Sequence, residues 1–124
     1  MNIRAQCTVF LLLAGWLSAG HTAIRQIEQA FELSAAQVQL PTRPEAQLTV
    51  RPCVGCRVVA LRVTAATRWY TSMTAQQPAS QAEVLEIYRT ASSNPQTLVH
   101  VFYEPQTLRV QRVMLDIPAG VQSQ

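Results

Sequence analysis

The chain has 124 residues, of which 48% are apolar and 14% are charged, so it suits one folded domain and is too apolar for general disorder. Its ten basic residues are all arginine, and seven acidic residues bring the net charge to +3. Because the arginines are scattered rather than gathered in runs, the composition predicts no nucleic-acid partner. The lack of lysine also excludes Schiff-base catalysis and a phosphate-binding P-loop.

The first 23 residues have the three-part pattern of a secretory signal peptide. Arg4 supplies the positive charge, residues 8–17 form an apolar run, and small residues follow. A membrane-spanning helix needs roughly 20 apolar residues, so this run is too short for a stable anchor. We therefore expect export to the periplasm or the exterior, with cleavage after one of residues 20–23 and no stable membrane insertion afterwards.

Cleavage would remove Cys7 and leave Cys53 and Cys56 as the cysteines of the mature chain. Exported proteins meet an oxidising compartment, in which disulfides persist. The turn residues around this pair predict a structural disulfide at a hairpin turn, and Gly55 gives the short ring its backbone freedom.

Other functions of the Cys53–Cys56 pair remain open. A thioredoxin-like redox pair needs a helix behind the first cysteine, whereas β-branched residues follow Cys56. A structural zinc site needs four ligands, and the chain offers only His100 and His21 besides the pair, although two thiolates can hold Cu(I). Covalent haem attachment is excluded, because Arg57 stands where a histidine is required.

Residues 24–44 carry mixed signals. Ile24, Ile27 and Phe31 recur at helical spacing, while Pro41 interrupts regular structure further on. The sequence predicts a short helix here, followed by a proline-containing linker into the compact part of the chain.

The compact domain is predicted over residues 45–118 and begins with two strands. Leu48 and Val50 alternate with polar residues, which is the period of a half-buried strand. Residues 57–64 are dense in β-branched side chains and predict the second strand, whose extension through Thr71 remains open.

A helix is predicted next. Ser80 and Glu83 have the spacing of a capping box, in which each side chain bonds the other residue's backbone amide. Val84, Leu85 and Tyr88 then form an apolar stripe along one face. The helix is expected to end before Pro95.

Two further strands complete the predicted fold. Residues 97–104 are apolar on both faces, and after a turn at Pro105 the alternation resumes and changes phase at Arg112, which predicts a β-bulge. The predicted fold class is α+β, a small four-stranded antiparallel sheet in the order ββαββ with one covering helix. Residues 119–124 are expected to fray.

The sequence contains no recognisable catalytic arrangement. His100 lies in a predicted strand, and the nucleophile motif Gly-x-Ser-x-Gly does not occur. Glu83 and Glu86 stand near a helix start, where the helix dipole favours acids without any catalytic role. We therefore expect no enzymatic activity and no cofactor.

The expected function is that of a non-catalytic structural or interaction module with a Cys53–Cys56 disulfide. An unidentified protein partner would dock on the sheet face that the helix leaves uncovered, or at a free sheet edge, and Trp69 and Tyr70 are the candidate binding residues. The alternative is a periplasmic thiol–disulfide redox protein, or a copper- or zinc-handling protein, that uses the same two cysteines.

Overall fold

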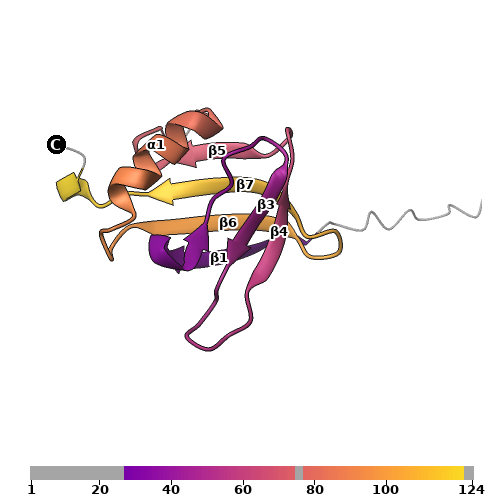
Figure 1. Cartoon of the computed structure of the whole chain (residues 1–124). Helices are drawn as coiled ribbons and strands as arrows, with labels where there is room; N and C mark the ends of the chain where they lie inside the picture. The colour runs from indigo at the N-terminus through magenta and orange to yellow at the C-terminus, as the bar shows by residue number, and fades with distance from the viewer. Residues whose placement is uncertain (1–26, 75–76, 122–124) are drawn as a thin grey trace, which may run out of the picture.

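The computed structural model describes residues 27–74 and 77–121, which form seven strands, one α-helix and three short 3-10 turns (Figure 1). The predicted four-stranded antiparallel sheet is wrong, because the sheet is mixed and has seven strands. The predicted signal peptide and residues 122–124 lie outside the described residues. The elements are β1 (Gln29–Ser34), η1 (Ala35–Gln37), β2 (Val38–Gln39), β3 (Ala46–Val50), β4 (Val59–Val63), β5 (Arg68–Thr71), η2 (Ser72–Thr74), α1 (Gln81–Ala91), β6 (Leu98–Glu104), β7 (Arg109–Asp116) and η3 (Ala119–Val121).

Strand β7 joins the two parts of the sheet. One edge of β7 pairs antiparallel with β6, and β1 pairs antiparallel with the far edge of β6. The other edge of β7 is shared, because Arg109 pairs with Arg62 of β4 while residues 112–115 pair with β5, both in parallel. Strands β3 and β2 continue antiparallel from β4. The two parallel pairings are long-range contacts that a purely antiparallel prediction does not contain.

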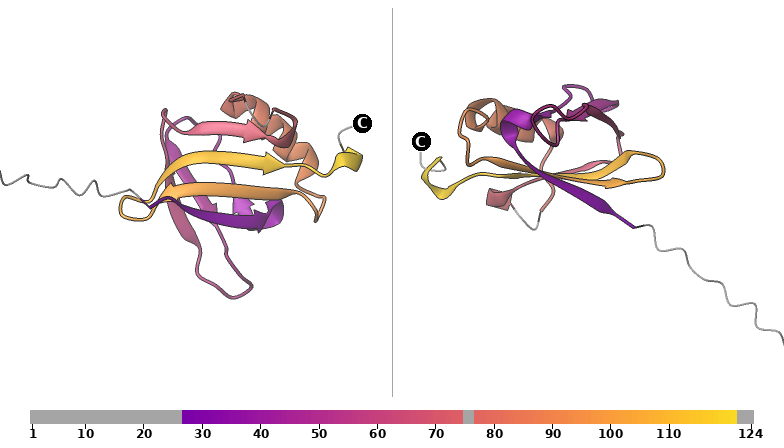
Figure 2. Two further views of the ribbon diagram at one scale, coloured as in Figure 1. Left: turned by 180° about the vertical axis from the view of Figure 1, so that it is seen from behind. Right: turned by 90° about the horizontal axis from the view of Figure 1, so that it is seen from below.

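Strands β1, β6, β7 and β5 form a four-stranded layer. The helix α1 and the strands β3 and β4 lie on one side of this layer, which we call its inner face (Figure 2). The inner face is lined by buried apolar side chains, because these alternate with outward residues along each strand. They are Leu33, Trp69, Val99, Val101, Val110, Val113 and Leu115.

Residues 29–34 form a strand instead of the predicted helix. Strand β1 pairs with β6 along its whole length, and Leu33 is buried between exposed or half-buried neighbours. Phe31 stacks on Tyr103 of β6, with ring centroids 5.1 Å apart and ring planes 7° apart. Pairing with β6 therefore overrides the local helical spacing, and this segment belongs to the sheet.

The predicted helix is confirmed, together with its capping box. Ser80 Oγ accepts a hydrogen bond from the Glu83 amide at 3.2 Å, and the Ser80 amide donates to Glu83 Oε2 at 3.0 Å. Val84 and Leu85 of α1 are buried in the core. The capping box involves residues only three positions apart, so the sequence predicts it without knowledge of the rest of the fold.

The hydroxyl of Tyr88 fastens α1 to the turn between β1 and β2. It donates to the carbonyl oxygen of Ala35 at 3.1 Å and also to that of Val38. Burial raises the pKa of Tyr88 above its ordinary value of 10.0, because the charged phenolate is disfavoured there. The neutral hydroxyl is the form that these two bonds require.

The predicted β-bulge is also confirmed. Phe102 pairs with Arg112 and Tyr103 pairs with Val110, so Gln111 is an extra residue on β7. This single insertion keeps both Val110 and Val113 on the buried inner face although they are three residues apart.

Candidate functional site

Cys53 and Cys56 form a disulfide in the loop between β3 and β4, which confirms the predicted bond and its place in a hairpin. The Cys56 amide donates to the Cys53 carbonyl at 3.2 Å, and Gly55 has a φ of 81°, as a type II turn requires. The loop projects from the body of the molecule (Figure 1), and Val54 at its tip is fully exposed. The ring is therefore accessible from outside.

The surroundings of this disulfide differ from those of a thioredoxin-like pair. Cys53 is exposed, and the chain after Cys56 continues as a loop into β4 rather than as a helix. The helix dipole that activates thiols in redox proteins is thus missing from this loop. Within residues 27–74 and 77–121, no three His, Cys, Asp or Glu side chains come together to hold a metal ion.

The two candidate binding residues, Trp69 and Tyr70, lie on opposite faces of β5. Trp69 is 5% exposed and belongs to the core, and its carbonyl accepts a hydrogen bond from the Ala79 amide at 2.7 Å. Tyr70 is half-buried and faces the opposite side of the layer. Of the two, only Tyr70 contributes to a surface.

The opposite side of the four-stranded layer, its outer face, is covered neither by α1 nor by β3 and β4 (Figure 2). Half-buried apolar, aromatic and imidazole side chains cross it, and the register places Tyr70 beside Met114 and Met114 beside His100. His100 Nδ1 lies 3.8 Å from Glu32 Oε2 on β1. We call this group the outer strip, and it consists of Tyr70, Leu98, His100, Phe102 and Met114.

One end of the outer strip is basic. The Arg112 guanidinium lies over the Phe102 ring, 3.9 Å from its centroid, and its Nε lies 3.4 Å from Glu28 Oε1. Arg109 Nη2 lies 3.7 Å from Oε2 of Glu104, whose side chain is buried. The bulge at Gln111 is the reason that these two arginines share one face, since residues three apart in a regular strand point to opposite faces.

A cleft of about 470 Å³ lies at this basic end. Three arginines from two parallel strands open onto it, and Arg68 stands beside Arg112 in the register. We call it the arginine cleft, and its lining residues are Ile27, Glu28, Ala66, Arg68, Glu104, Arg109, Gln111 and Arg112.

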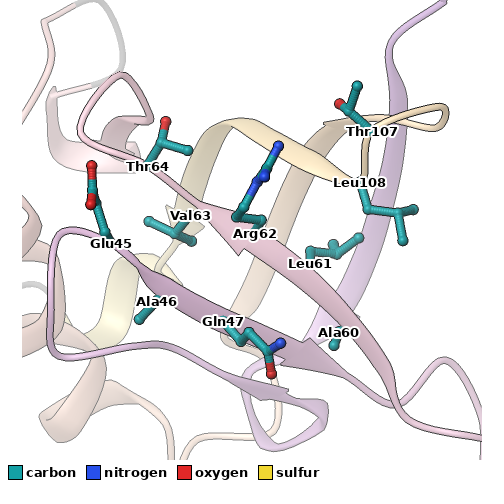
Figure 3. Close-up of a pocket in the computed structure, with 10 residues that line it drawn as sticks. All are labelled: Glu45, Ala46, Gln47, Ala60, Leu61, Arg62, Val63, Thr64, Thr107 and Leu108. Atoms are coloured by element: carbon teal, nitrogen blue, oxygen red, sulfur yellow. The ribbon is translucent and has the colours of Figure 1, made fainter.

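A second hollow, of about 600 Å³, lies beside β4 and the turn between β6 and β7 (Figure 3). Leu108 in that turn is 42% exposed and has a φ of 57°, which costs a non-glycine residue on the order of 1–3 kcal/mol. Its carbonyl accepts from the Arg62 amide at 2.8 Å, which fixes the turn against β4. In the described part of the chain no ion pair joins Glu45 and Arg62 across this hollow.

No protein-family model matches the chain, and no curated protein or solved structure matches it either. No helix among the described residues is long and apolar enough to cross a bilayer. Function is therefore inferred from the surfaces described above.

The arginine cleft was not foreseen from the sequence, in which its three arginines are separated by up to 44 positions. The phase change at Arg112 was a usable signal, because a bulge there implies that Arg109 and Arg112 share a face. That Arg68 and Arg112 are neighbours could not be predicted from the sequence, because it depends on the parallel pairing of two distant strands.

Proposed function

We propose that this chain is a non-catalytic interaction module that docks a partner protein on the outer face of β1, β6, β7 and β5. The observation that carries the proposal is the outer strip, whose side chains are only partly buried, while Val99, Val101, Val113 and Leu115 on the inner face of the same strands are completely buried. Tyr, Phe, Met and Arg are the residue types enriched in the cores of protein interfaces. Tyr70, Phe102, Met114 and Arg112 bring all four types together on this face.

A protein partner fits this face better than a small ligand does. The outer strip spans three strands and forms a broad surface, whereas small-molecule sites are enclosed and concave. The basic end of the outer strip is complementary to a negatively charged region of the partner. A second copy of this chain is an alternative occupant that the experiment below distinguishes.

The place of action that we propose is the periplasm or the exterior of the cell. The signal-peptide pattern of residues 1–23 supports export. The Cys53–Cys56 disulfide supports it as well, because such bonds persist in oxidising compartments.

The test is site-specific photo-cross-linking in cells that express the full chain. A photoreactive residue at position 114 is expected to capture one discrete protein, and the same residue at position 83, on the exposed side of α1, is expected to capture none. The Tyr70→Ser change should abolish the first cross-link without lowering the melting temperature by more than a few degrees. Equal capture at both positions, or a product containing only two copies of this chain, contradicts the proposal.

A second candidate function is thiol–disulfide exchange or metal handling by Cys53 and Cys56. The observation that favours it is the exposure of Cys53 at a projecting loop tip, where a thiolate or metal donor can reach it. Structural disulfides typically have reduction potentials below about −300 mV, whereas oxidants lie near −120 to −180 mV. A measured potential in the lower range, together with no mixed disulfide trapped by Cys56→Ser and no Cu(I) or zinc bound by the reduced chain, excludes this candidate.

A further inference from the structure

The parallel pairings of β7 set two pairs of arginines side by side, and one of these pairs lies on the outer face. The register of the parallel strands places Arg62 next to Arg109 and Arg68 next to Arg112. Neighbouring strands present register partners on the same face, so each pair sets two positive charges close together. Like charges at such positions destabilise a sheet. Four of the eight described arginines are thus held in an arrangement that folding by itself disfavours.

The acidic side chains at this end balance only part of the charge. Glu104 pairs with Arg109 and Glu28 pairs with Arg112. In the described part of the chain, Arg62 and Arg68 form no ion pair, and of the two Arg68 lines the arginine cleft. An excess of positive charge therefore remains around the arginine cleft.

The geometry of the cleft suits carboxylates. Glu104 and Thr107 hold the turn beside Arg109, since Thr107 Oγ1 donates to Glu104 Oε2 at 3.0 Å. The Phe102 ring and Glu28 hold Arg112, so the guanidinium is positioned before any partner arrives. A guanidinium binds a carboxylate through two parallel hydrogen bonds, and a positioned one loses less entropy in doing so. Gln111, displaced by the bulge, adds an amide to the same cleft.

From these observations we propose that the partner presents an acidic segment to the arginine cleft, with carboxylates at Arg68, Arg109 and Arg112 and apolar side chains continuing onto the outer strip. This inference rests on the proposed function and names the chemistry of the docked surface. The continuity of Arg112 with Phe102 favours a peptide over a polysaccharide or a phosphate ion, because a peptide supplies negative and apolar groups in sequence.

The experiment measures the fluorescence anisotropy of two labelled peptides with the purified disulfide-bonded protein. The first peptide has three glutamates followed by Phe, Leu and Met, and the second has glutamines in place of the glutamates. The acidic peptide is expected to bind at least about tenfold more tightly, and its affinity should fall as salt is raised. If the acidic peptide does not bind, or if both peptides bind with equal affinity, the proposal that the partner presents an acidic segment is wrong.

The decisive variant is Arg68→Glu, because Arg68 is exposed and forms no ion pair within the described residues. Its matched control is Arg43→Glu, which makes the same change of charge at an exposed position outside the cleft. We expect Arg68→Glu to weaken binding of the acidic peptide by about tenfold or more, and Arg43→Glu to change it less than about twofold. Equal losses in the two variants overturn the inference, as does stronger competition by a sulfated oligosaccharide of equal charge than by the unlabelled acidic peptide.

A further variant separates this inference from the proposed function. Met114→Ser removes an apolar contact of the outer strip and leaves every arginine in place. If Met114→Ser weakens the binding of both peptides while Arg68→Glu weakens the binding of neither, the proposed docking face stands and the proposal of an acidic segment is wrong. If Met114→Ser leaves both affinities unchanged, the proposed docking face itself is wrong.

Discussion

The two faces of the layer formed by β1, β6, β7 and β5 are built from the same strands but differ in how far they are buried. On the inner face, Val99, Val101, Val113 and Leu115 are completely buried under α1 and the second part of the sheet. On the outer face the alternate residues are larger, more polar and only half-buried. Burial of the inner face supplies the free energy of folding, so the residues of the outer face are available for another role.

This difference teaches that a strand with two apolar faces need not be a central strand of a closed core. Strand β6 is apolar on both sides, yet Val99 and Val101 on its inner side are completely buried while the residues on its outer side are only partly buried. The alternation of full and partial burial along β6 distinguishes the side that stabilises the protein from the side that we assign to docking.

The comparison predicts its largest effect for truncations on the inner face. Leu115→Ala should lower the free energy of unfolding by about 2–5 kcal/mol, because a fully buried leucine leaves a cavity. The adjacent Met114→Ala should cost about 1 kcal/mol or less, since Met114 is only partly buried. Urea titration of both variants measures the contrast, and equal losses would show that the outer face is also part of the core.

The next effect concerns the attachment of α1 over the inner face. Tyr88→Phe should cost about 1–3 kcal/mol, because the carbonyls of Ala35 and Val38 lose their donor. The pKa of Tyr88 is raised in the folded protein, so this stabilisation is complete below pH 10.0 and is lost as the pH rises through the folded-state value. As the pH is raised through and beyond 10.0, the urea midpoint of the wild type should therefore fall more steeply than the urea midpoint of Tyr88→Phe.

A smaller effect is expected from the disulfide, which lies outside both faces. The double change Cys53→Ser/Cys56→Ser should lower stability by about 2 kcal/mol at most, because the ring that it opens contains only four residues. Thermal unfolding with and without reductant checks this. A loss as large as that of Leu115→Ala would mean that the loop supports the core.

The smallest effect has the opposite sign and lies at the arginine cleft. Arg68→Thr should raise the free energy of unfolding by about 0.2–0.5 kcal/mol, because it removes one of the two like charges of the Arg68–Arg112 pair. Threonine is also a good strand former. The gain should shrink at high salt. Arg43→Thr serves as the control, and a loss of stability on Arg68→Thr would mean that this arginine serves the fold rather than a partner.

Sequence patterns were informative where structure depends on near neighbours. The Ser80–Glu83 capping box, the Cys53–Cys56 turn and the bulge near Arg112 all involve residues within a few positions of each other. Patterns failed where distant strands decide, as at residues 29–34, where pairing with β6 replaced the predicted helix. The face of β5 was readable from its period of two, which separates Trp69 from Tyr70, but its parallel partner was not.

The position of β7 in the sheet has a consequence for the order in which the chain folds. This strand comes last in the sequence of the sheet, yet it pairs with β4, β5 and β6. A chain that ends before residue 109 would lack the pairing partner that joins these three strands. The sheet therefore cannot be completed until β7 (Arg109–Asp116) has been made, and long-range pairing of this kind is slow. For a chain that is exported, as we propose, such a delay would favour transport before the sheet is complete.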